Sequence, residues 1–288
     1  MPTITHNRAF PYENDKFDIL VGTFDEDDRG DEDDATYGFD DKQDGRDVLS
    51  VHFDGTDGND QVFGGPNDDT IKGGKGLDAL YGEGGNDWIY GGADRDWLFG
   101  GDDRDHLFGE GGLDEMYGDS GDDELYGGEL SDLLDGGPGI DILVGGRDAD
   151  WLTGGSEPDR FLFIYANGFD NDSSSSNPDL IMDFNWKEGD IIVVEGSEQD
   201  PSSDNYEEAT IGYGAGYDDA KEHAESLLLN SDKAYAFVTD GVDGYLFVDA
   251  QSGGPVSDAA IEMGIILVGL TSESDFAWTN VWTSMSGL

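Results

Sequence analysis

Residues 55–162 consist of a nine-residue repeat that occurs twelve times without a gap. Glycine holds the first position of every copy, aspartate holds the sixth, and a large apolar residue holds the eighth. The copies at 73–81 and 136–144 are the clearest, and they read GGKGLDALY and GGPGIDILV. A fixed short period of this kind indicates a solenoid, because each repeat buries its apolar side chain only against its neighbours.

One repeat predicts a tight turn followed by a short strand. Glycine adopts positive φ at little steric cost, so the first six positions suit a turn whose backbone carbonyls face inward. The last three positions read polar, apolar and variable, which places one side chain inside. Two repeats then close one coil of eighteen residues. Stacked coils form two parallel sheets around the eighth-position side chains, so the predicted fold is all-β.

The sixth-position aspartates stack on one another along both edges of such a solenoid. Strands in neighbouring coils lie roughly 4.8 Å apart, and two carboxylates at that distance repel by about 3 kcal/mol at an effective dielectric near 20. A divalent cation between them removes this repulsion. The predicted metal ligands are therefore Asp60, Asp69, Asp78, Asp87, Asp96, Asp105, Asp114, Asp123, Asp132, Asp141, Asp150 and Asp159.

The available ligand atoms favour calcium. The repeats offer carboxylate and carbonyl oxygens, contain no cysteine and include one histidine, His106. Hard oxygen ligands in flexible loops suit Ca²⁺, whereas Zn²⁺ and Cu²⁺ prefer softer ligands and Mg²⁺ demands rigid octahedral geometry. The alternative, an acidic surface repeat without metal, gives no reason for an aspartate in every turn.

These residues resemble a known family. The repeat is similar to the nonapeptide of the RTX (repeats-in-toxin, hemolysin-type) calcium-binding proteins, which form a parallel β-roll. The resemblance implies that each calcium lies between turns of neighbouring coils, held by sixth-position aspartates and turn carbonyls. Aspartates eighteen residues apart then pair, which implies up to about ten calcium ions. In the two clearest copies, the turn residues that this assigns to the metal sites are Gly74, Gly76, Gly137 and Gly139.

Two turns depart from the pattern at the fourth position, where glycine is usual. Leu130 and Glu157 replace it, and asparagine or aspartate replaces it in four other copies. Asparagine and aspartate tolerate left-handed backbone better than other residues. The sequence therefore predicts the weakest sites in turns 127–132 and 154–159.

The charge of the chain restricts its partners. The net charge is −53, and about ten calcium ions would leave it strongly negative. Nucleic acid is not an expected partner, because binding it requires a basic footprint. The absence of cysteine excludes disulfides, and no run of 18 apolar residues predicts a transmembrane segment. Residues 1–22 show no cleavable signal peptide.

The flanks of the repeats predict two caps. Residues 1–54 are expected to form an acidic N-terminal cap with degenerate repeats, including 18–22 and 45–50, around the acidic run 25–34. Residues 163–288 are expected to form a β-rich C-terminal cap, which resembles the segment after the β-roll in serralysin-type proteins. Its predicted strands are 161–166, 179–184, 190–194 and 260–270, with a hairpin of 234–239 and 245–249. Residues 218–230 carry the only good helical pattern.

Two classes of function agree with these features. The first is a secreted, non-enzymatic calcium-binding protein that folds outside the cell and serves as a surface, matrix or interaction module. The RTX resemblance implies export from a bacterium by type 1 secretion through an uncleaved C-terminal signal. The second is a module that binds or modifies polysaccharide. The sequence contains no His-Glu-x-x-His or Gly-x-Ser-x-Gly motif, so no enzyme activity is predicted.

Aromatic residues flank the inward eighth position and are expected to face outward. Tyrosine or phenylalanine at the ninth position is expected to stack on the coil above, as is common in the family. Three tryptophans at the seventh position, Trp88, Trp97 and Trp151, are the predicted partner-binding residues. A large indole that faces water often marks a contact surface for another protein, a sugar or a second copy of the chain.

Overall fold

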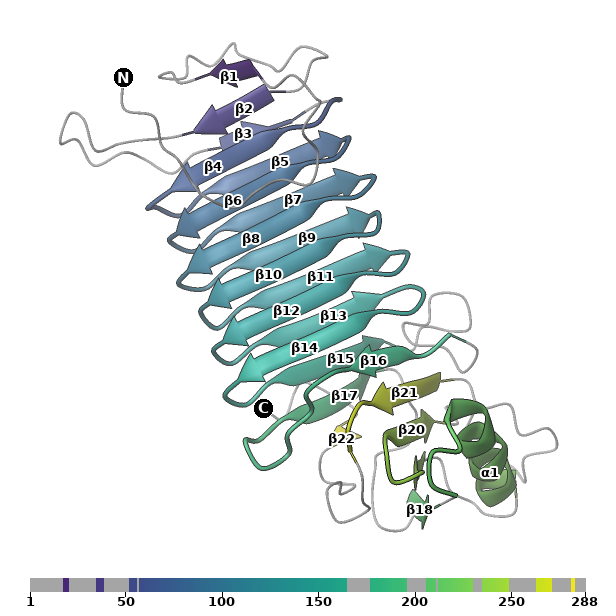
Figure 1. Ribbon diagram of the computed structural model, residues 1–288. Helices are drawn as coiled ribbons and strands as arrows, with labels where there is room; N and C mark the ends of the chain where they lie inside the picture. Colours follow the sequence, from purple (N-terminus) through teal and green to yellow (C-terminus); the bar gives the residue numbers. More distant parts are fainter. Residues whose placement is uncertain are drawn as a thin grey trace.

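The computed structural model describes residues 18–20, 35–38, 52–55, 57–164, 177–195, 206–210, 212–229, 235–248, 263–270 and 281–282. These residues form two long, mainly parallel sheets that face each other along an elongated body, with α1 (Tyr217–Leu229) near its C-terminal end (Figure 1). The acidic run 25–34, the degenerate repeat 45–50 and most of the tail after residue 270 lie outside the described residues.

Sheet A has thirteen strands. In spatial order they are β1 (Asp18–Leu20), β2 (Ala35–Gly38), β4 (Gln61–Gly65), β6 (Ala79–Gly84), β8 (Trp97–Asp102), β10 (Glu115–Ser120), β12 (Leu133–Pro138), β14 (Trp151–Ser156), β16 (Asp179–Ile181), β21 (Met263–Leu267), β20 (Gly244–Val248), β19 (Tyr235–Thr239) and β18 (Tyr206–Thr210).

Sheet B has nine strands. In spatial order they are β22 (Val281–Trp282), β17 (Ile191–Glu195), β15 (Arg160–Ile164), β13 (Ile142–Gly146), β11 (Glu124–Glu129), β9 (His106–Gly111), β7 (Trp88–Ala93), β5 (Thr70–Lys75) and β3 (His52–Asp54).

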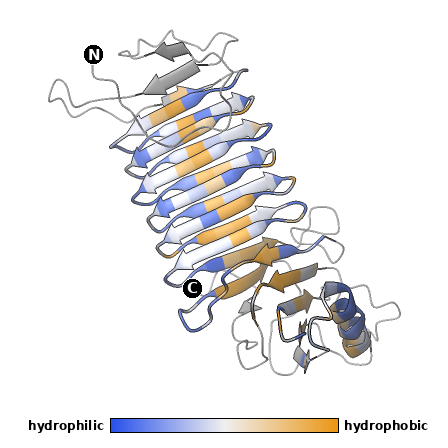
Figure 2. Ribbon diagram, in the orientation of Figure 1, coloured by the Kyte–Doolittle hydropathy of each residue, from blue (hydrophilic) through white to orange (hydrophobic). Residues whose placement is uncertain are grey.

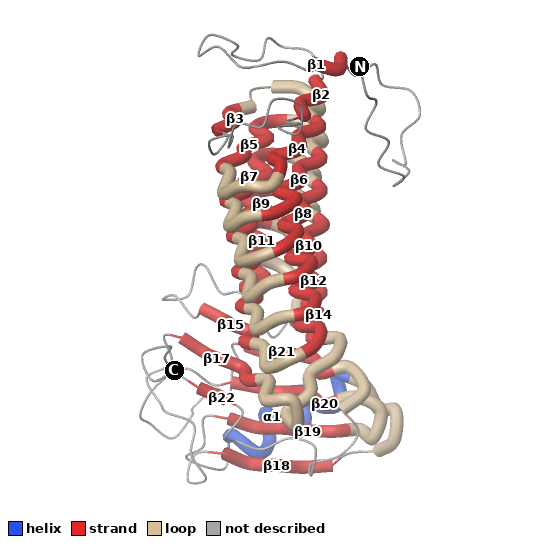
Figure 3. Tube along the Cα trace, turned by 90° about the vertical axis from the view of Figure 1, so that its left-hand side faces the viewer, coloured by secondary structure: helices blue, strands red, loops and turns tan. Residues whose placement is uncertain are grey.

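The strand register confirms the coil of eighteen residues. Leu98 pairs with Leu80 on one side and Met116 on the other, so equal repeat positions stack in parallel. The strands are longer than the three residues expected, because cross-coil pairing continues past the ninth position. Gly101 still pairs with Glu83, for example. The turn proper therefore shrinks to the residues around the aspartate, and these turns stack in a column along the edge (Figure 3).

The core is one apolar column between the sheets. All twelve eighth-position side chains, from Val62 to Phe161, are fully buried. The column continues without a break into β16, β17 and the C-terminal strands, where Tyr235, Phe237 and Ile265 are also buried. Figure 2 shows this as an apolar band that crosses the middle of the strands. The repeats and the C-terminal strands thus share one hydrophobic core.

The coils extend beyond the repeats at both ends. At the N-terminal end, β1 and β2 continue sheet A, with Leu20 paired to Tyr37 and Tyr37 to Val62. Phe53 of β3 pairs with Ile71 and is buried. At the other end, β16 pairs with β14 and β17 pairs with β15, so these two strands form one more coil.

The C-terminal region agrees with most of its predicted elements. The hairpin is observed as antiparallel β19 and β20, and the helix as α1, which packs Ala220, Ala224 and Leu228 against β19 and β20. The strand expected at 179–184 ends earlier, at Ile181, because the chain bends away toward the next turn. Phe184, expected in that strand, is instead buried after the bend.

Candidate metal centre

The sixth-position aspartates form two buried columns, one along each edge of the roll. Each lies directly before a strand, so the aspartates of one edge precede sheet A and those of the other edge precede sheet B. None of the twelve is more than 6% exposed. Edge A comprises Asp60, Asp78, Asp96, Asp114, Asp132 and Asp150, and edge B comprises Asp69, Asp87, Asp105, Asp123, Asp141 and Asp159.

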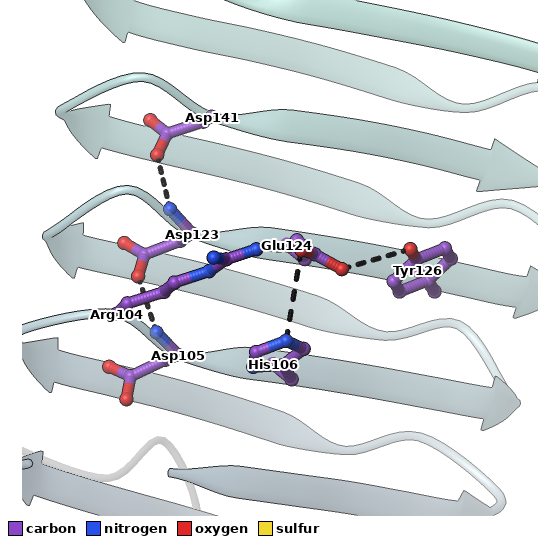
Figure 4. Close-up of polar contacts among 7 residues, drawn as sticks. All are labelled: Arg104, Asp105, His106, Asp123, Glu124, Tyr126 and Asp141. Carbon is purple, nitrogen blue, oxygen red and sulfur yellow. Dashed lines mark hydrogen bonds and ion pairs between the residues drawn. The ribbon is translucent and has the colours of Figure 1, made fainter. Parts of the chain in front are cut away.

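A regular hydrogen-bond ladder holds each column together. The backbone N–H of each aspartate donates to Oδ1 of the aspartate one coil later, at 2.7–2.9 Å. Figure 4 shows two steps on edge B, from Asp105 to Asp123 and from Asp123 to Asp141. The ladder fixes one oxygen of every carboxylate and orients the other.

The second oxygen is buried without a hydrogen bond. Among the described residues, Oδ2 has no hydrogen-bond partner in Asp87, Asp96, Asp105, Asp114, Asp123, Asp132, Asp141 or Asp159. Buried polar atoms in folded proteins nearly always have a partner, and an unsatisfied one costs about 1–3 kcal/mol, more when it is charged. A column of such atoms therefore indicates that a ligand completes these turns.

The first-position glycines surround that oxygen with backbone. A Cβ added at Gly91 would lie 2.6 Å from Asp96 Oδ2 and 3.0 Å from the carbonyl oxygen of Gly109 in the next coil. The absence of a side chain thus brings a carboxylate oxygen and a carbonyl oxygen to one point. These donors are all hard oxygens, which fit Ca²⁺.

Side chains alone do not assemble this site. No group of three or more histidine, cysteine or acidic residues among the described residues is arranged to hold a metal. The atoms available as metal ligands are instead the aspartate oxygens together with backbone carbonyl oxygens. The ligand set that the repeat implies, in which turn backbone completes the coordination, stays a prediction.

In the absence of a cation, burial disfavours the ionised form of these carboxylates and so raises their pKa values. It raises the pKa of Asp96 to about 9, that of Asp105, Asp132 and Asp159 to about 8, and that of Asp87, Asp114, Asp123 and Asp141 to about 7. The N–H donated within the ladder opposes this rise, and in most of these groups neighbouring carboxylates add to it. A bound cation would reverse the balance, because it stabilises the ionised form.

The four predicted turn glycines adopt backbone that favours glycine. Gly74, Gly76, Gly137 and Gly139 have φ of 111°, 124°, 100° and 147°. A Cβ at Gly76, Gly137 or Gly139 would overlap the backbone of the preceding coil. At these three positions the coils therefore pack in close contact, and the assignment of all four glycines to the metal sites stays a prediction.

The turns with unusual fourth positions keep the common backbone. Leu130 and Glu157 have φ of 74° and 79°, the left-handed conformation also seen at the fourth-position residues Asp94 and Asp103, both at 76°. Asp132 and Asp159 in these turns remain buried, at 3% and 1% exposure. The departure costs backbone strain rather than turn geometry, and the predicted weakness of these two sites stays a prediction.

The sequence reasoning missed three aspartates that continue edges A and B past residue 162. The N–H of Asp150 donates to Asp179 Oδ1 at 2.9 Å, and that of Asp159 donates to Asp190 Oδ1 at 3.1 Å. Asp183 accepts from Gly154 N and Gly155 N at 3.0 and 2.9 Å. Asp179-Leu180-Ile181 and Asp190-Ile191-Ile192 repeat the order aspartate, any residue, apolar residue, which is the signal that was available.

The ninth-position rings stack as expected. Phe63, Tyr81, Phe99 and Tyr117 form a ladder on sheet A with centroids 4.7–5.2 Å apart and planes within 8° of parallel. Tyr90, Phe108 and Tyr126 form a second ladder on sheet B. Because the ring faces cover one another, these rings stabilise the stack of coils and offer mainly their edges to solvent.

The three tryptophans lie on the outer faces of the sheets. Trp88 and Trp151 are exposed, at 42% and 54%, and Trp97 is partly buried. Trp88 stacks on His106 at 4.2 Å, and the Arg95 guanidinium lies 5.1 Å from the centre of the Trp97 ring. The seventh position is thus outward-facing, but the structure does not bring the three indoles together.

Beside edge B, polar side chains join neighbouring coils on the outer face of sheet B (Figure 4). Glu124 forms an ion pair with Arg104, accepts a hydrogen bond from the Tyr126 hydroxyl at 3.2 Å, and lies 3.7 Å from His106 Nε2. On edge A, Arg95 forms the equivalent pair with Glu115. Each of these two Arg–Glu ion pairs links a turn to a strand of the following coil.

Two parallel sheets, joined by glycine-rich turns of which eight bury an unsatisfied carboxylate oxygen among the described residues, define a cation-binding parallel β-roll. The family model of the RTX calcium-binding nonapeptide repeat (4 copies) matches residues 54–89, 90–125 and 126–161. Residues 54–161 are therefore RTX calcium-binding repeats folded as a parallel β-roll, and repeats of this kind are typical of secreted proteins. Among curated proteins, none matches the sequence.

The likeness of residues 163–288 to the segment that follows the roll in serralysin-type proteins stays a prediction, as do the proposed domain boundaries. No helix among the described residues has the length and apolarity needed to cross a membrane.

Proposed function

We propose that this chain is a secreted protein whose roll folds when calcium fills the turns outside the cell, and that it acts as a non-enzymatic surface, matrix or interaction module. The observation that carries the proposal is the buried Oδ2 in turn after turn. In calcium-poor surroundings these atoms oppose folding, and in calcium-rich surroundings they become ligands. The buried aspartates would therefore make folding depend on the calcium concentration of the compartment.

The affinity and binding free energy expected of such calcium sites favour folding that depends on calcium. Extracellular calcium modules bind with dissociation constants of about 10⁻⁴–10⁻³ M, far above cytosolic calcium. At free calcium about tenfold above that value, each independent site adds about 1.4 kcal/mol to stability. About ten independent sites would together add about 14 kcal/mol, which is comparable to the net stability of a typical domain, about 5–15 kcal/mol. An unfolded chain inside the cell would also suit export by type 1 secretion.

Far-ultraviolet circular dichroism of the full chain tests the proposal. We expect little strand signal in metal-free buffer and a cooperative gain between about 0.1 and 10 mM calcium. Magnesium at the same ionic strength is the control and should give a much smaller gain. A roll that is equally folded without calcium would contradict the proposal.

A polysaccharide-binding or polysaccharide-modifying module is the second candidate, favoured by the exposed indoles of Trp88 and Trp151. Alanine at each position, with Trp97→Ala alongside, separates the two candidates in a calcium-dependent glycan-binding screen that also monitors turnover. Lost glycan binding with unchanged calcium folding would favour this candidate. Absence of glycan binding and turnover in the unaltered chain would favour the first.

A further inference from the structure

One more turn lies on the last repeat turn of edge B. Turn 183–190 follows β16 and precedes β17, and these strands pair with β14 and β15 on either side of turn 154–159. The N–H of Asp159 donates to Asp190 Oδ1 at 3.1 Å, which repeats the step from Asp141 to Asp159 at 2.9 Å. We call this contact between the two turns the seam.

At the seam, Asp183 takes the place that a first-position glycine holds elsewhere. It follows Ile181 by two residues, as Gly154 follows Leu152, and those two apolar residues pair across the coils. Its carboxylate accepts from Gly154 N at 3.0 Å through Oδ1 and from Gly155 N at 2.9 Å through Oδ2. A carboxylate therefore faces Gly154 where, in the repeats, a glycine carbonyl faces the coil below.

An unsatisfied oxygen points to the same place from the turn below. Asp159 is 1% exposed, and its Oδ2 has no hydrogen-bond partner among the described residues. This oxygen lies so close to Gly154 that a Cβ there would overlap it. Asp159 Oδ2 and the Asp183 carboxylate thus both border Gly154, with no positively charged side chain paired to either in the described part of the chain.

Asp190 has a different part in this arrangement. Its Oδ1 accepts from Asp159 N, and its Oδ2 accepts from Asn185 N at 2.7 Å. Both oxygens are therefore engaged by backbone, and Asp190 positions Asp159 rather than offering an orphan oxygen. Asp183 retains acceptor capacity, because each carboxylate oxygen has two lone pairs and uses one.

We propose that the seam binds one further Ca²⁺ ion, outside the nonapeptide repeats, between Asp159 Oδ2 and the Asp183 carboxylate. The proposal rests on calcium binding by the repeats, which it extends to the joint between the roll and the C-terminal strands. The Asp183 carboxylate stands where a repeat turn offers a glycine carbonyl, so the seam has a higher ligand charge than a repeat turn. Higher ligand charge tightens calcium binding, so the seam should fill before the average repeat turn.

Counting bound ions in the full chain tests the proposal. Native mass spectrometry at saturating calcium should show one ion fewer for Asp183→Asn than for the unaltered chain. The matched control is Asp148→Asn, which makes the same charge change at an exposed left-handed position in a repeat turn. The control should keep the full number of ions. An equal count for Asp183→Asn and the unaltered chain would overturn the proposal.

A second measurement keeps the test decisive if Asp183→Asn folds poorly. Trp186 lies within the seam turn and is 38% exposed, so it can sensitise Tb³⁺ bound there. Trp186→Phe should remove emission that appears at the first equivalents of Tb³⁺, whereas Trp97→Phe should reduce emission at later equivalents. Unchanged early emission in Trp186→Phe would count against the seam. No ion on the unaltered chain would instead refute calcium binding by the repeats.

Discussion

The backbone N–H of Asp105 donates to Asp123 Oδ1 at 2.8 Å, and this bond aims the other oxygen of Asp123 at the glycines of its own and the next turn. A Cβ at Gly118 would lie 2.6 Å from Asp123 Oδ2 and 2.5 Å from the Gly136 carbonyl oxygen. The hydrogen bond thus sets the coil spacing and pre-positions an oxygen for a cation. Metal binding and coil stacking are coupled through one side chain.

Because of that coupling, an aspartate inside a column should matter more than one at its end. Asp105→Asn keeps an oxygen that accepts from Asp87 N but removes the charge, and both neighbouring sites on edge B use this residue. We expect the calcium midpoint of folding to rise by about tenfold, equivalent to about 1.4 kcal/mol. Asp60→Asn is the control, since Asp60 begins the edge A column and is followed there by Asp78, and its midpoint should rise less. Equal shifts for the two variants would contradict the stacking register.

The stability of the calcium-free folded roll should decrease as pH rises. The buried aspartates have folded pKa values of about 7–9, above the ordinary value of 3.8. The folded roll therefore holds protons that the unfolded chain releases, so stability is highest below about pH 4 and falls between that pH and about 9. Circular dichroism of calcium-stripped protein should show more strand at pH 5 than at pH 9. Strand content that increases with pH would contradict this account.

Protons and calcium should compete for the same oxygens. In a metal-free roll that is already folded, the carboxylates with pKa values of about 7–9 hold protons at pH 6, so calcium must displace protons to bind this form. The calcium midpoint should therefore rise as pH falls from 8 to 6, and titration calorimetry in buffers of different ionisation enthalpy should report proton release. A midpoint and heat independent of pH and buffer would contradict proton displacement and would show that calcium binds an unfolded chain whose aspartates are already ionised.

Leu130 stores strain that glycine would relieve. Its φ is 74° and its side chain is 50% exposed, so little packing offsets a left-handed cost of about 1–2 kcal/mol. Glycine adds back about 0.5–1 kcal/mol of unfolded-state entropy, so Leu130→Gly should stabilise the calcium-loaded roll by about 0.5–1 kcal/mol. Urea unfolding in excess calcium measures this. Ser131→Gly in the same turn is the control and should destabilise, since Ser131 has no positive φ.

The sequence was sufficient to predict the roll because its period is unbroken. Aspartate and an apolar residue two positions later recur every nine residues, so register, core and buried columns follow from spacing alone. The turn shape at Leu130 was harder to anticipate, because neighbouring coils impose a left-handed backbone that leucine disfavours locally.

The extra coil was hidden because its spacing changes. Asp179 lies 29 residues after Asp150, and Asp190 lies 31 after Asp159, in place of eighteen. A hydrophobic period cannot reveal a strand that joins the sheet after insertions of that length. The role of Asp183 was also invisible, because it depends on which backbone N–H groups of the turn below it faces.

Anomalous diffraction from crystals grown in calcium is the most direct test of where the metal lies. The account predicts peaks along both edges of the roll, each within about 2.3–2.6 Å of a buried aspartate Oδ2 and of turn carbonyl oxygens. Peaks confined to exposed acidic side chains, with the edges of the folded roll free of anomalous signal, would contradict it.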